Sequence, residues 1–530
     1  MLRSVGLAKW VAMGVFLVLA LAPVLLLGVM WLAPALAKNP QMLAWALPSY
    51  RSLQLLGKSF LLAATVAVMA MVLGTSLAVW MCSEGRWQKF VRATYLVPFL
   101  IPPYIHVLTW MAIAGRRQIL DQVLTWILGP EHFTLSTYGF WPTASVLTLA
   151  TFPIVTLLVR GGLEAIEPEL LEAASLVKEP WSVARRILLP LVMPSILAGA
   201  GLVFVLALIE YGVPSMFEYN CYVSEIYASF SQTFDPMMSF AFSLPLMALA
   251  VAVLALSESQ LRNSPLRGQP SFHLRLATST WAWPARAFLL LSVGVWGIAS
   301  AAPALLLLAR GGMPRVLAAA VAPAGQELTL TIIVAATCAV TATAVALPLA
   351  VALTRQTSTG KLSWLVCVLP LAVPAPVTGI ALIYLWNQPW LDWGYGTPLM
   401  LVVAHVARIL PFGIYAAASQ VRHIDPLLAE AASLPDVSRW RRFLWVHAPM
   451  MAPAIAITSL IVFVLSLGEL GASLLVAPPG EATLPMRIYN LLHYGATDTV
   501  SALSLVILLV AGAACAGVLM SRKRLWGGTA

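Results

Sequence analysis

The sequence contains few charged residues. Only 10% of its 530 residues are Asp, Glu, Lys or Arg, against about 25% in soluble globular domains, whereas 60% are hydrophobic. Five cysteines are too few for a disulfide scaffold, and the apolar content excludes disordered and collagen-like chains. We therefore predict an integral membrane protein.

Motifs for catalysis, nucleotide binding and metal binding are also absent from the sequence. No Gly-x-x-x-x-Gly-Lys-Ser/Thr loop occurs, because Gly360-Lys361 is followed by Leu362, so ATP is not expected to bind to this chain. The seven histidines form no His-Glu-x-x-His motif and the cysteines form no Cys-x-x-Cys motif, so no metal site is firmly predicted. We expect a protein that is not an enzyme, with no catalytic residues and no bound cofactor.

Long apolar runs are abundant instead. A spanning helix needs about 20 predominantly apolar residues, and twelve segments satisfy this length: 10–34, 59–82, 92–114, 138–160, 191–213, 237–256, 286–309, 329–354, 363–386, 398–419, 449–474 and 498–520. The first is predicted to be an uncleaved helix, because its apolar run exceeds the roughly 7–15 residues of a secretory signal. The predicted fold is an all-α integral membrane protein with about twelve transmembrane helices.

The net charge of +10 reflects 31 Lys+Arg against 21 Asp+Glu. If the N-terminus is inside, most of the Lys and Arg lie in the cytoplasmic loops and termini, as the positive-inside rule requires. The charge therefore predicts membrane orientation, with both termini cytoplasmic and a lipid bilayer around the chain, and no nucleic-acid partner is expected. On the outer side, the amphipathic stretch Ile119–Gly129 and the polar stretch Glu218–Asp235 could form part of a docking surface.

The chain repeats itself at an offset of about 260 residues, which is the signature of an internal duplication. The matched segments are Ile166-Glu167-Pro168 with Ile424-Asp425-Pro426, Glu172-Ala173-Ala174-Ser175-Leu176 with Glu430-Ala431-Ala432-Ser433-Leu434, and Phe204–Gly212 with Phe463–Gly471. We predict two parallel halves of six spans each, residues 1–256 and 286–530. A basic, turn-rich cytoplasmic linker, residues 257–285, joins them.

One cytoplasmic loop in each half, residues 161–190 and 420–448, has the same plan. In the second loop, Asp425 suits a helix N-cap and Pro426 the first helical position. Helix-forming residues follow, and a second, basic and aromatic helix is expected to end near Pro449. A single such loop could be an ordinary solvated loop with positive-inside charges. Two copies at equivalent places favour a docking site for a duplicated partner.

The loop pattern, Glu-Ala-Ala with a proline about 19 residues after the Glu, resembles the EAA loop of permeases in binding-protein-dependent ABC importers. The second copy has that spacing from Glu430 to Pro449, and the first is one residue shorter. The chain departs from the family at Lys178 and Asp436, where the family usually has Gly, which leaves the geometry of that turn open. The resemblance covers nearly the whole chain, and the fused twelve-span layout with Thr483–Asn490 looks most like the ferric-iron branch.

The resemblance implies a location in the bacterial inner membrane and a transport function. Two ATP-binding-cassette ATPase subunits would bind the cytoplasmic loops and carry the ATP, and a periplasmic substrate-binding protein would deliver the substrate. Ferric iron is the expected substrate, with thiamine, polyamines, phosphonates or sulfate as alternatives. The residues expected to couple to the ATPases are Glu172, Ala173, Ala174, Trp181, Arg185, Arg186, Glu430, Ala431, Ala432, Trp440, Arg441 and Arg442.

A self-sufficient secondary transporter is the alternative from another class, because such proteins often have twelve spans in two parallel halves. It predicts ion-coupling charges deep in the spans and no duplicated protruding loop. The sequence shows few intramembrane charges and a duplicated loop, so the importer is favoured.

Ionisable residues inside spans are candidates for a translocation pathway, because burying a charge in lipid is costly. Glu210 and Glu469 occupy equivalent places, and two converging carboxylates could meet a hard cation. The alternative is that both are helix-end residues that bond neighbouring backbone. His405 and Arg408, one helical turn apart in the tenth span, are further candidates, and Arg408 is expected to pair with a carboxylate such as Glu469.

Two proline clusters, Pro98–Pro103 and Pro370–Pro376, are expected to break the third and ninth spans. Such breaks free backbone carbonyls that neighbouring helices or a water-filled cavity must satisfy. They are tolerated beside pathways, although proline is also common in membrane helices generally.

Overall fold

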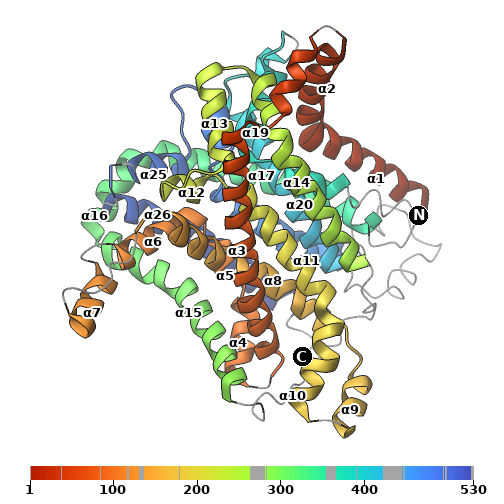
Figure 1. Cartoon of the computed structure of the whole chain (residues 1–530), viewed down its shortest axis with the longest axis vertical. Helices are drawn as coiled ribbons and strands as arrows, with labels where there is room; N and C mark the ends of the chain where they lie inside the picture. Colours follow the sequence, from red (N-terminus) through yellow and green to blue (C-terminus); the bar gives the residue numbers. More distant parts are fainter. Residues whose placement is uncertain are drawn as a thin grey trace.

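The structure, a computed structural model, is helical, and no strand occurs among the residues that it describes. These residues are 2–37, 39–83, 85–115, 118–129, 137–177, 179–262, 281, 283–353, 366–389, 391–421, 445, 448–492, 494–495 and 498–526. Figure 1 shows the chain as a bundle of long helices with shorter helices at its ends.

Ten helices in these ranges are long and apolar enough to cross a membrane. They are Lys9–Ala37, Pro40–Met81, Phe140–Glu164, Trp181–Leu208, Pro236–Gln260, Trp283–Gly311, Pro314–Leu353, Pro398–Val421, Ala448–Leu467 and Asp498–Ser521. Two bent pairs supply the remaining spans: Arg86–Leu100 with Pro103–Ala114, bent by 91°, and Val366–Ala372 with Ala375–Trp386, bent by 105°. With each pair counted once, the twelve spans correspond to the twelve predicted segments, and the all-α membrane fold is confirmed.

The helices of the first half run in chain order from α1 to α14. Those in or beside spans are α1 (Leu2–Phe16), η1 (Leu17–Leu21), α2 (Ala22–Ala37), α3 (Tyr50–Met81), α4 (Arg86–Thr94), α5 (Val97–Leu100), α6 (Pro103–Ala114), α8 (Phe140–Glu164), α11 (Leu189–Leu208) and α14 (Pro236–Arg262). The side predicted to be outer carries η2 (Pro40–Ala46), α7 (Ile119–Leu128), α12 (Gly212–Met216) and α13 (Tyr222–Thr233). The predicted cytoplasmic loop contains α9 (Pro168–Val177), α10 (Pro180–Val183) and η3 (Ala184–Leu188).

The described residues of the second half repeat the order of the spans. Its spans contain α15 (Trp283–Gly311), α17 (Gly325–Leu353), η6 (Leu369–Ala372), α19 (Ala375–Trp386), α20 (Pro398–Val421), α23 (Ala448–Leu467) and α26 (Asp498–Trp526). The side predicted to be outer carries α16 (Pro314–Val321), η5 (Ala322–Ala324), η7 (Asp392–Gly394), α24 (Ser473–Val476) and α25 (Leu484–Leu492).

The breaks in the third and ninth spans have one cause. Ile101 and Val373 each precede a proline and adopt extended backbone, with ψ of 122° and 119°. A residue before proline is driven out of the helical region by a clash with the proline ring, and the helix restarts at Pro103 or Ala375. The predicted breaks are therefore present at equivalent places in both halves.

Each half has a core of three tightly packed spans: α3, α8 and α11 in the first, and α17, α20 and α23 in the second. Glycines allow the close approach. A Cβ atom at Gly74 of α3 would lie 2.7 Å from Val155 Cβ, and one at Gly199 of α11 would lie 3.0 Å from Val155 Cα. In the second half, a Cβ atom at Gly413 would lie 3.1 Å from Val462 Cγ2. The two cores use equivalent helices.

The first span of each half packs against the opposite half. In the first half, α1 contacts α17 and α2 contacts α19; in the second, α15 contacts α3 and α6. The broken spans also cross the boundary, since α5 contacts α23 and the ring of Phe99 lies 6.1 Å from that of Phe412 on α20. The halves are thus interlocked, and their broken spans lie at the contact between them.

Candidate translocation site and coupling loop

Glu210 and Glu469 lie in two equivalent turns, each two residues after a helix ends, because α11 ends at Leu208 and α23 at Leu467. The predicted spans ran to residues 213 and 474, so this part of the prediction was wrong. Both carboxylates bond backbone that follows: Oε1 of Glu210 accepts from the Gly212 N–H, and Oε1 of Glu469 from the Ala472 N–H, each at 3.0 Å. These side-chain hydrogen bonds take the place of the backbone bonds that would continue α11 and α23. They also satisfy backbone N–H donors at the start of α12 and α24.

The two turns meet where the halves meet. A Cβ atom at Gly212 would lie 3.7 Å from Leu470 Cδ2 of the other half. A Cβ atom at Gly468 would lie 2.8 Å from Pro102 Cγ in the broken third span, a separation that real Cβ atoms do not show. The second turn therefore packs directly on the break of the opposite half, with no room for a side chain at position 468.

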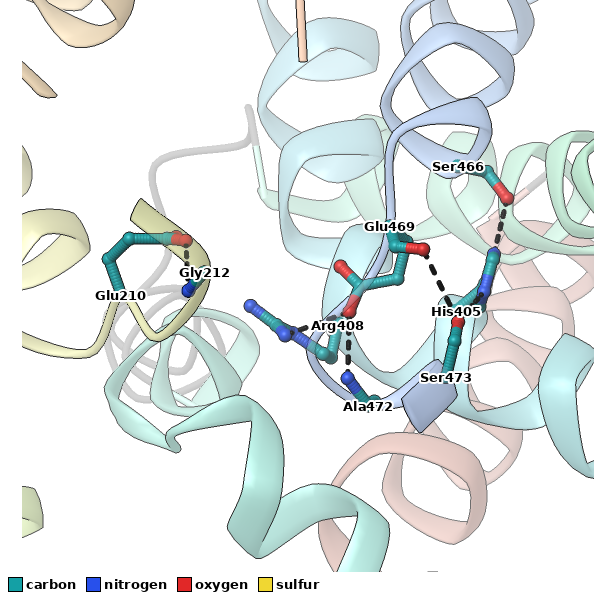
Figure 2. A network of polar contacts seen from close by, with 8 residues as sticks. All are labelled: Glu210, Gly212, His405, Arg408, Ser466, Glu469, Ala472 and Ser473. Atoms are coloured by element: carbon teal, nitrogen blue, oxygen red, sulfur yellow. Dashed lines mark hydrogen bonds and ion pairs between the residues drawn. The ribbon is translucent and has the colours of Figure 1, made fainter. Parts of the chain in front are cut away.

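Arg408 connects the tenth span to the second turn. Its Nη1 atom donates to Oε1 of Glu469 at 2.9 Å, and the two side chains are 20% and 11% exposed. The predicted pairing with a carboxylate is present. In Figure 2 the guanidinium extends from the Glu469 turn toward the turn that carries Glu210. The site thus brings one carboxylate from each half, and the cation that pairs with Glu469, to the contact between the halves.

His405 holds both ends of the Glu469 turn. Its Nδ1 atom lies 2.7 Å from Ser466 Oγ and its Nε2 atom 2.8 Å from Ser473 Oγ, and the Ser473 hydroxyl donates to the Glu469 carbonyl at 3.3 Å. The imidazole is buried, at 2% exposure. His405 therefore orients the turn through the two serines, as Figure 2 shows.

The polar partners occur in one half only. The first-half positions that match His405, Arg408, Ser466 and Ser473 are occupied by Leu147, Ala150, Ala207 and Pro214. His405 and Arg408 were predicted from the sequence, whereas Ser466 and Ser473 were missed. The concerted change of four matched positions from apolar to polar residues is the signal that could have revealed them.

The outer helices α13 and α25 are attached to the second and eighth spans in the same way. The Tyr222 N–H donates to Ser59 Oγ at 2.8 Å, and the Leu484 N–H donates to Thr331 Oγ1 at 2.8 Å. Each attachment also includes an ion pair, and the positions of the acidic and basic residues are exchanged between the two halves. Arg51 of α3 pairs with Glu225 of α13, whereas Glu327 of α17 pairs with Arg487 of α25.

The first of the two predicted loops contains two helices, as expected. The helix α9 begins at Pro168, which matches Pro426 of the second loop, and α10 begins at Pro180. The second helix was expected to end near the matched proline, Pro190, but it continues through η3 into α11. The π turn of η3 rearranges the backbone just before Pro190, a residue that cannot donate the next helical hydrogen bond. The loop is therefore rigidly connected to the fifth span.

The structure places part of the predicted coupling surface. In the first loop Ala173, Arg185 and Arg186 are exposed, and Trp181 is 44% exposed, with its ring 5.3 Å from that of Trp281 in the linker. Glu172 belongs to α9 and Ala174 is half-buried there. The side chain of Glu172 and several residues of both loops lie outside the described residues: Lys178, Glu430, Ala431, Ala432, Asp436, Trp440, Arg441 and Arg442.

Two further features of the described residues bear on binding. No group of three or more His, Cys, Asp or Glu residues among them could hold a metal ion. A shallow, open pocket of about 390 Å³ lies on the surface between α3 and α8, lined by Ala64, Thr65, Val68, Met69 and Trp141. It is apolar and does not include the Glu210 and Glu469 turns.

The sequence that forms these duplicated turns and broken spans matches a known protein family. The family of binding-protein-dependent transport system inner membrane components matches the chain twice, at residues 70–257 and 342–522. These ranges cover more than half of the chain, one in each repeat. The chain belongs to this family. It is an inner membrane component in which two copies of the family's conserved unit are fused, and the predicted resemblance to ABC importer permeases is confirmed at that level.

Three relatives of this inner membrane component show the range of substrates. YvgM of Bacillus subtilis (strain 168), provisionally named a molybdenum transport system permease protein, is 28% identical over 31% of this chain and 70% of its own length. The putrescine transport system permease protein PotI of Escherichia coli (strain K12) is 30% identical over 27% of this chain and 52% of its own. The Fe(3+)-transport system permease protein FbpB 2 of Haemophilus influenzae is 24% identical over 38% of this chain and 37% of its own length.

The relatives named for these substrates all match only part of the inner membrane component, and the alignments span between 37% and 70% of the relatives' lengths. Their identities to this chain fall within a narrow range. The comparison therefore supports the importer family and does not select the ferric-iron branch.

Proposed function

We propose that this chain is the membrane-spanning permease subunit of an ATP-driven importer. A periplasmic binding protein delivers the substrate to the outer side, the substrate passes between the two halves, and two ATP-binding-cassette ATPase subunits bind the cytoplasmic loops. Both termini lie in the cytoplasm. The observation that carries the proposal is the double match to the importer family, and the exposed helix α9, connected through α10 and η3 to the fifth span, supports it.

The geometry suggests how ATPase binding would reach the substrate. α9 packs on α10, and α10, η3 and α11 form one continuous helical segment that ends just before the Glu210 turn. A force applied to this end of the loop would therefore act on α11. The Glu210 turn contacts Leu470 of the opposite half. A shift of the loop would therefore change the contact between the two outer turns, which is the connection that an alternating-access transporter requires.

We further propose ferric iron as the substrate. Support comes from the resemblance to the iron branch, from the FbpB 2 relative, and from the charges of the site. It holds two carboxylates and one arginine, which pairs with Glu469, so its net charge is negative when all three groups are ionised. Hard cations favour oxygen ligands. The alternative is another small solute, and a polyamine is supported by the same negative site and by the PotI relative.

The coupling assignment is tested by reversing charge in both loops. We expect Glu172→Lys with Glu430→Lys to reduce copurification of the ATPase subunits and ATP-driven uptake at least tenfold. Glu481→Lys, on an exposed outer loop, is the matched control and should leave both unchanged. Normal assembly and transport in the double variant would contradict the assignment.

The substrate assignment needs a separate experiment. Cells that express this chain with its own ATPase and binding protein should accumulate radioactive ferric iron, and unlabelled putrescine or molybdate should not compete. Competition by putrescine at concentrations that leave iron binding unaffected would favour the polyamine alternative. Uptake of molybdate in place of iron would contradict a cationic substrate.

A further inference from the structure

The helix α7 (Ile119–Leu128) is an amphipathic element on the outer side, between the third and fourth spans. Its three polar residues, Asp121, Gln122 and Thr125, fall within about 100° of the helical wheel at 100° per residue, and the seven other residues are apolar. The corresponding stretch of the second half contains η7, a turn of three residues. α7 is thus an addition to the first half and not part of the repeated plan.

The apolar side of α7 is largely uncovered. The exposed fractions are 44% for Val123, 86% for Trp126 and 61% for Ile127. The helix packs chiefly on α6, and Figure 1 shows it projecting sideways from the bundle. A soluble surface rarely exposes a large aromatic and two β-branched residues together, so this face is expected to have a partner.

The attachment of α7 fixes its depth. It follows α6, which ends at Ala114, and Gln118 just before it accepts a hydrogen bond from Arg310 Nη2 at 3.1 Å. Arg310 lies in the last turn of α15, at the outer end of the seventh span. The start of α7 is therefore held at the outer ends of two spans, where the hydrocarbon of a bilayer gives way to headgroups.

The surface beside this attachment faces lipid. Leu305 and Leu308, within two turns of Arg310 on α15, are 65% and 58% exposed, which in a membrane-spanning helix places them against acyl chains. The apolar side of α7 continues this surface laterally.

We propose that α7 lies in the outer leaflet of the membrane, parallel to its plane. Val123, Ile127 and the neighbouring apolar residues enter the acyl boundary, and Trp126, at the edge of the polar arc, sits at headgroup level, where tryptophan is enriched. The helix carries one ionisable side chain, Asp121, and no basic residue. Its partner is therefore the bilayer interface itself, without a requirement for anionic lipid.

The proposal is tested with spin labels on the full-length chain in phosphatidylethanolamine/phosphatidylglycerol vesicles. Single cysteines replace Val123, Ile127, Gln122 and Thr125 in a Cys515→Ser background, because the other four native cysteines are buried. Leu305→Cys provides a lipid-facing reference and Glu481→Cys an aqueous one. The measurement is the ratio of collision with oxygen, which partitions into lipid, to collision with a water-soluble nickel chelate.

We expect labels at 123 and 127 to give ratios near that of Leu305→Cys, at least fivefold above those at 122 and 125. The same pattern should appear in vesicles of neutral phosphatidylcholine. Ratios at 123 and 127 near that of Glu481→Cys would overturn the proposal. The proposal would also be overturned if the labels at 123 and 127 collide with the nickel chelate until the binding protein is added and are shielded from it afterwards. That result would assign this face of α7 to a protein partner.

Discussion

Arg408 in the tenth span and Glu469 in the turn after the eleventh form a largely buried ion pair, with 2.9 Å between Nη1 and Oε1. The matched residues of the first half are Ala150 and Glu210. One arginine therefore serves a site with two equivalent carboxylates. A chain built from two repeats has become asymmetric at the place where its halves meet.

Removal of the arginine should destabilise the protein. Arg408→Gln leaves the Glu469 carboxylate without its cation, and breaking a buried pair in this way costs about 3–5 kcal/mol. We expect a clear fall in the thermal unfolding midpoint in detergent. The double variant Arg408→Gln/Glu469→Gln should recover part of the loss, because it removes both charges together. An unchanged midpoint in Arg408→Gln would show that the pair does not stabilise the fold.

Neutralising the two glutamates should have different consequences. Glu210→Gln keeps an oxygen that can accept from the Gly212 N–H, so the folded protein and its complex should persist while uptake falls at least tenfold. Glu469→Gln also breaks the pair with Arg408 and should lower the unfolding midpoint as well. Uptake rates and midpoints are measured on the same preparations. Normal uptake by Glu210→Gln would leave only a structural role for that carboxylate.

The contact between the halves at Gly468 should not tolerate a side chain. Gly468→Ala would place a Cβ atom 2.8 Å from the Pro102 ring, and overpacking of this kind costs about 1–3 kcal/mol. Gly294→Ala is the control, because no atom lies within 4 Å of its Cβ position, and in a helix it should be neutral or stabilising by up to about 1 kcal/mol. Equal unfolding midpoints for the two variants would contradict the close contact.

The attachment of the outer helices predicts local effects. Ser59→Ala and Thr331→Val remove the acceptors of the Tyr222 and Leu484 N–H groups, and a buried donor left unsatisfied costs about 1–3 kcal/mol. Amide exchange at the starts of α13 and α25 should accelerate roughly fivefold or more. Thr65→Val, whose hydroxyl bonds its own helix at an exposed position, should leave both sites protected. Exchange that matches this control would refute the attachment.

Local rules explain why much of the fold was predictable. Long apolar runs identified the twelve spans, and a proline after Ile101 or Val373 identified the breaks, because hydrophobicity and X-Pro sterics act within a few residues. Helix starts at Pro168 and Pro180 follow from the same kind of rule. The ends of α11 and α23 were missed, since most residues beyond Leu208 and Leu467 are apolar, with Glu210 and Glu469 as exceptions.

Long-range relationships were not predictable from the sequence. The packing of α1 on α17 and of α15 on α3 depends on which surfaces meet, and no local pattern encodes it. In the site, Arg408 was recognised because a charge in lipid is costly. Ser466 and Ser473 carry no charge and cost little in a helix, so single-residue reasoning gave them no weight. The coupling roles of both cytoplasmic loops stay predictions.

The most direct test of the central proposal is reconstitution of the chain with its ATPase subunits and binding protein in sealed vesicles, with ATP inside. Uptake of the loaded binding protein's substrate should require ATP, the ATPases and the binding protein together, and should persist when proton and sodium gradients are collapsed. Uptake by the chain alone, driven by an ion gradient without ATP, would contradict the account and identify a secondary transporter.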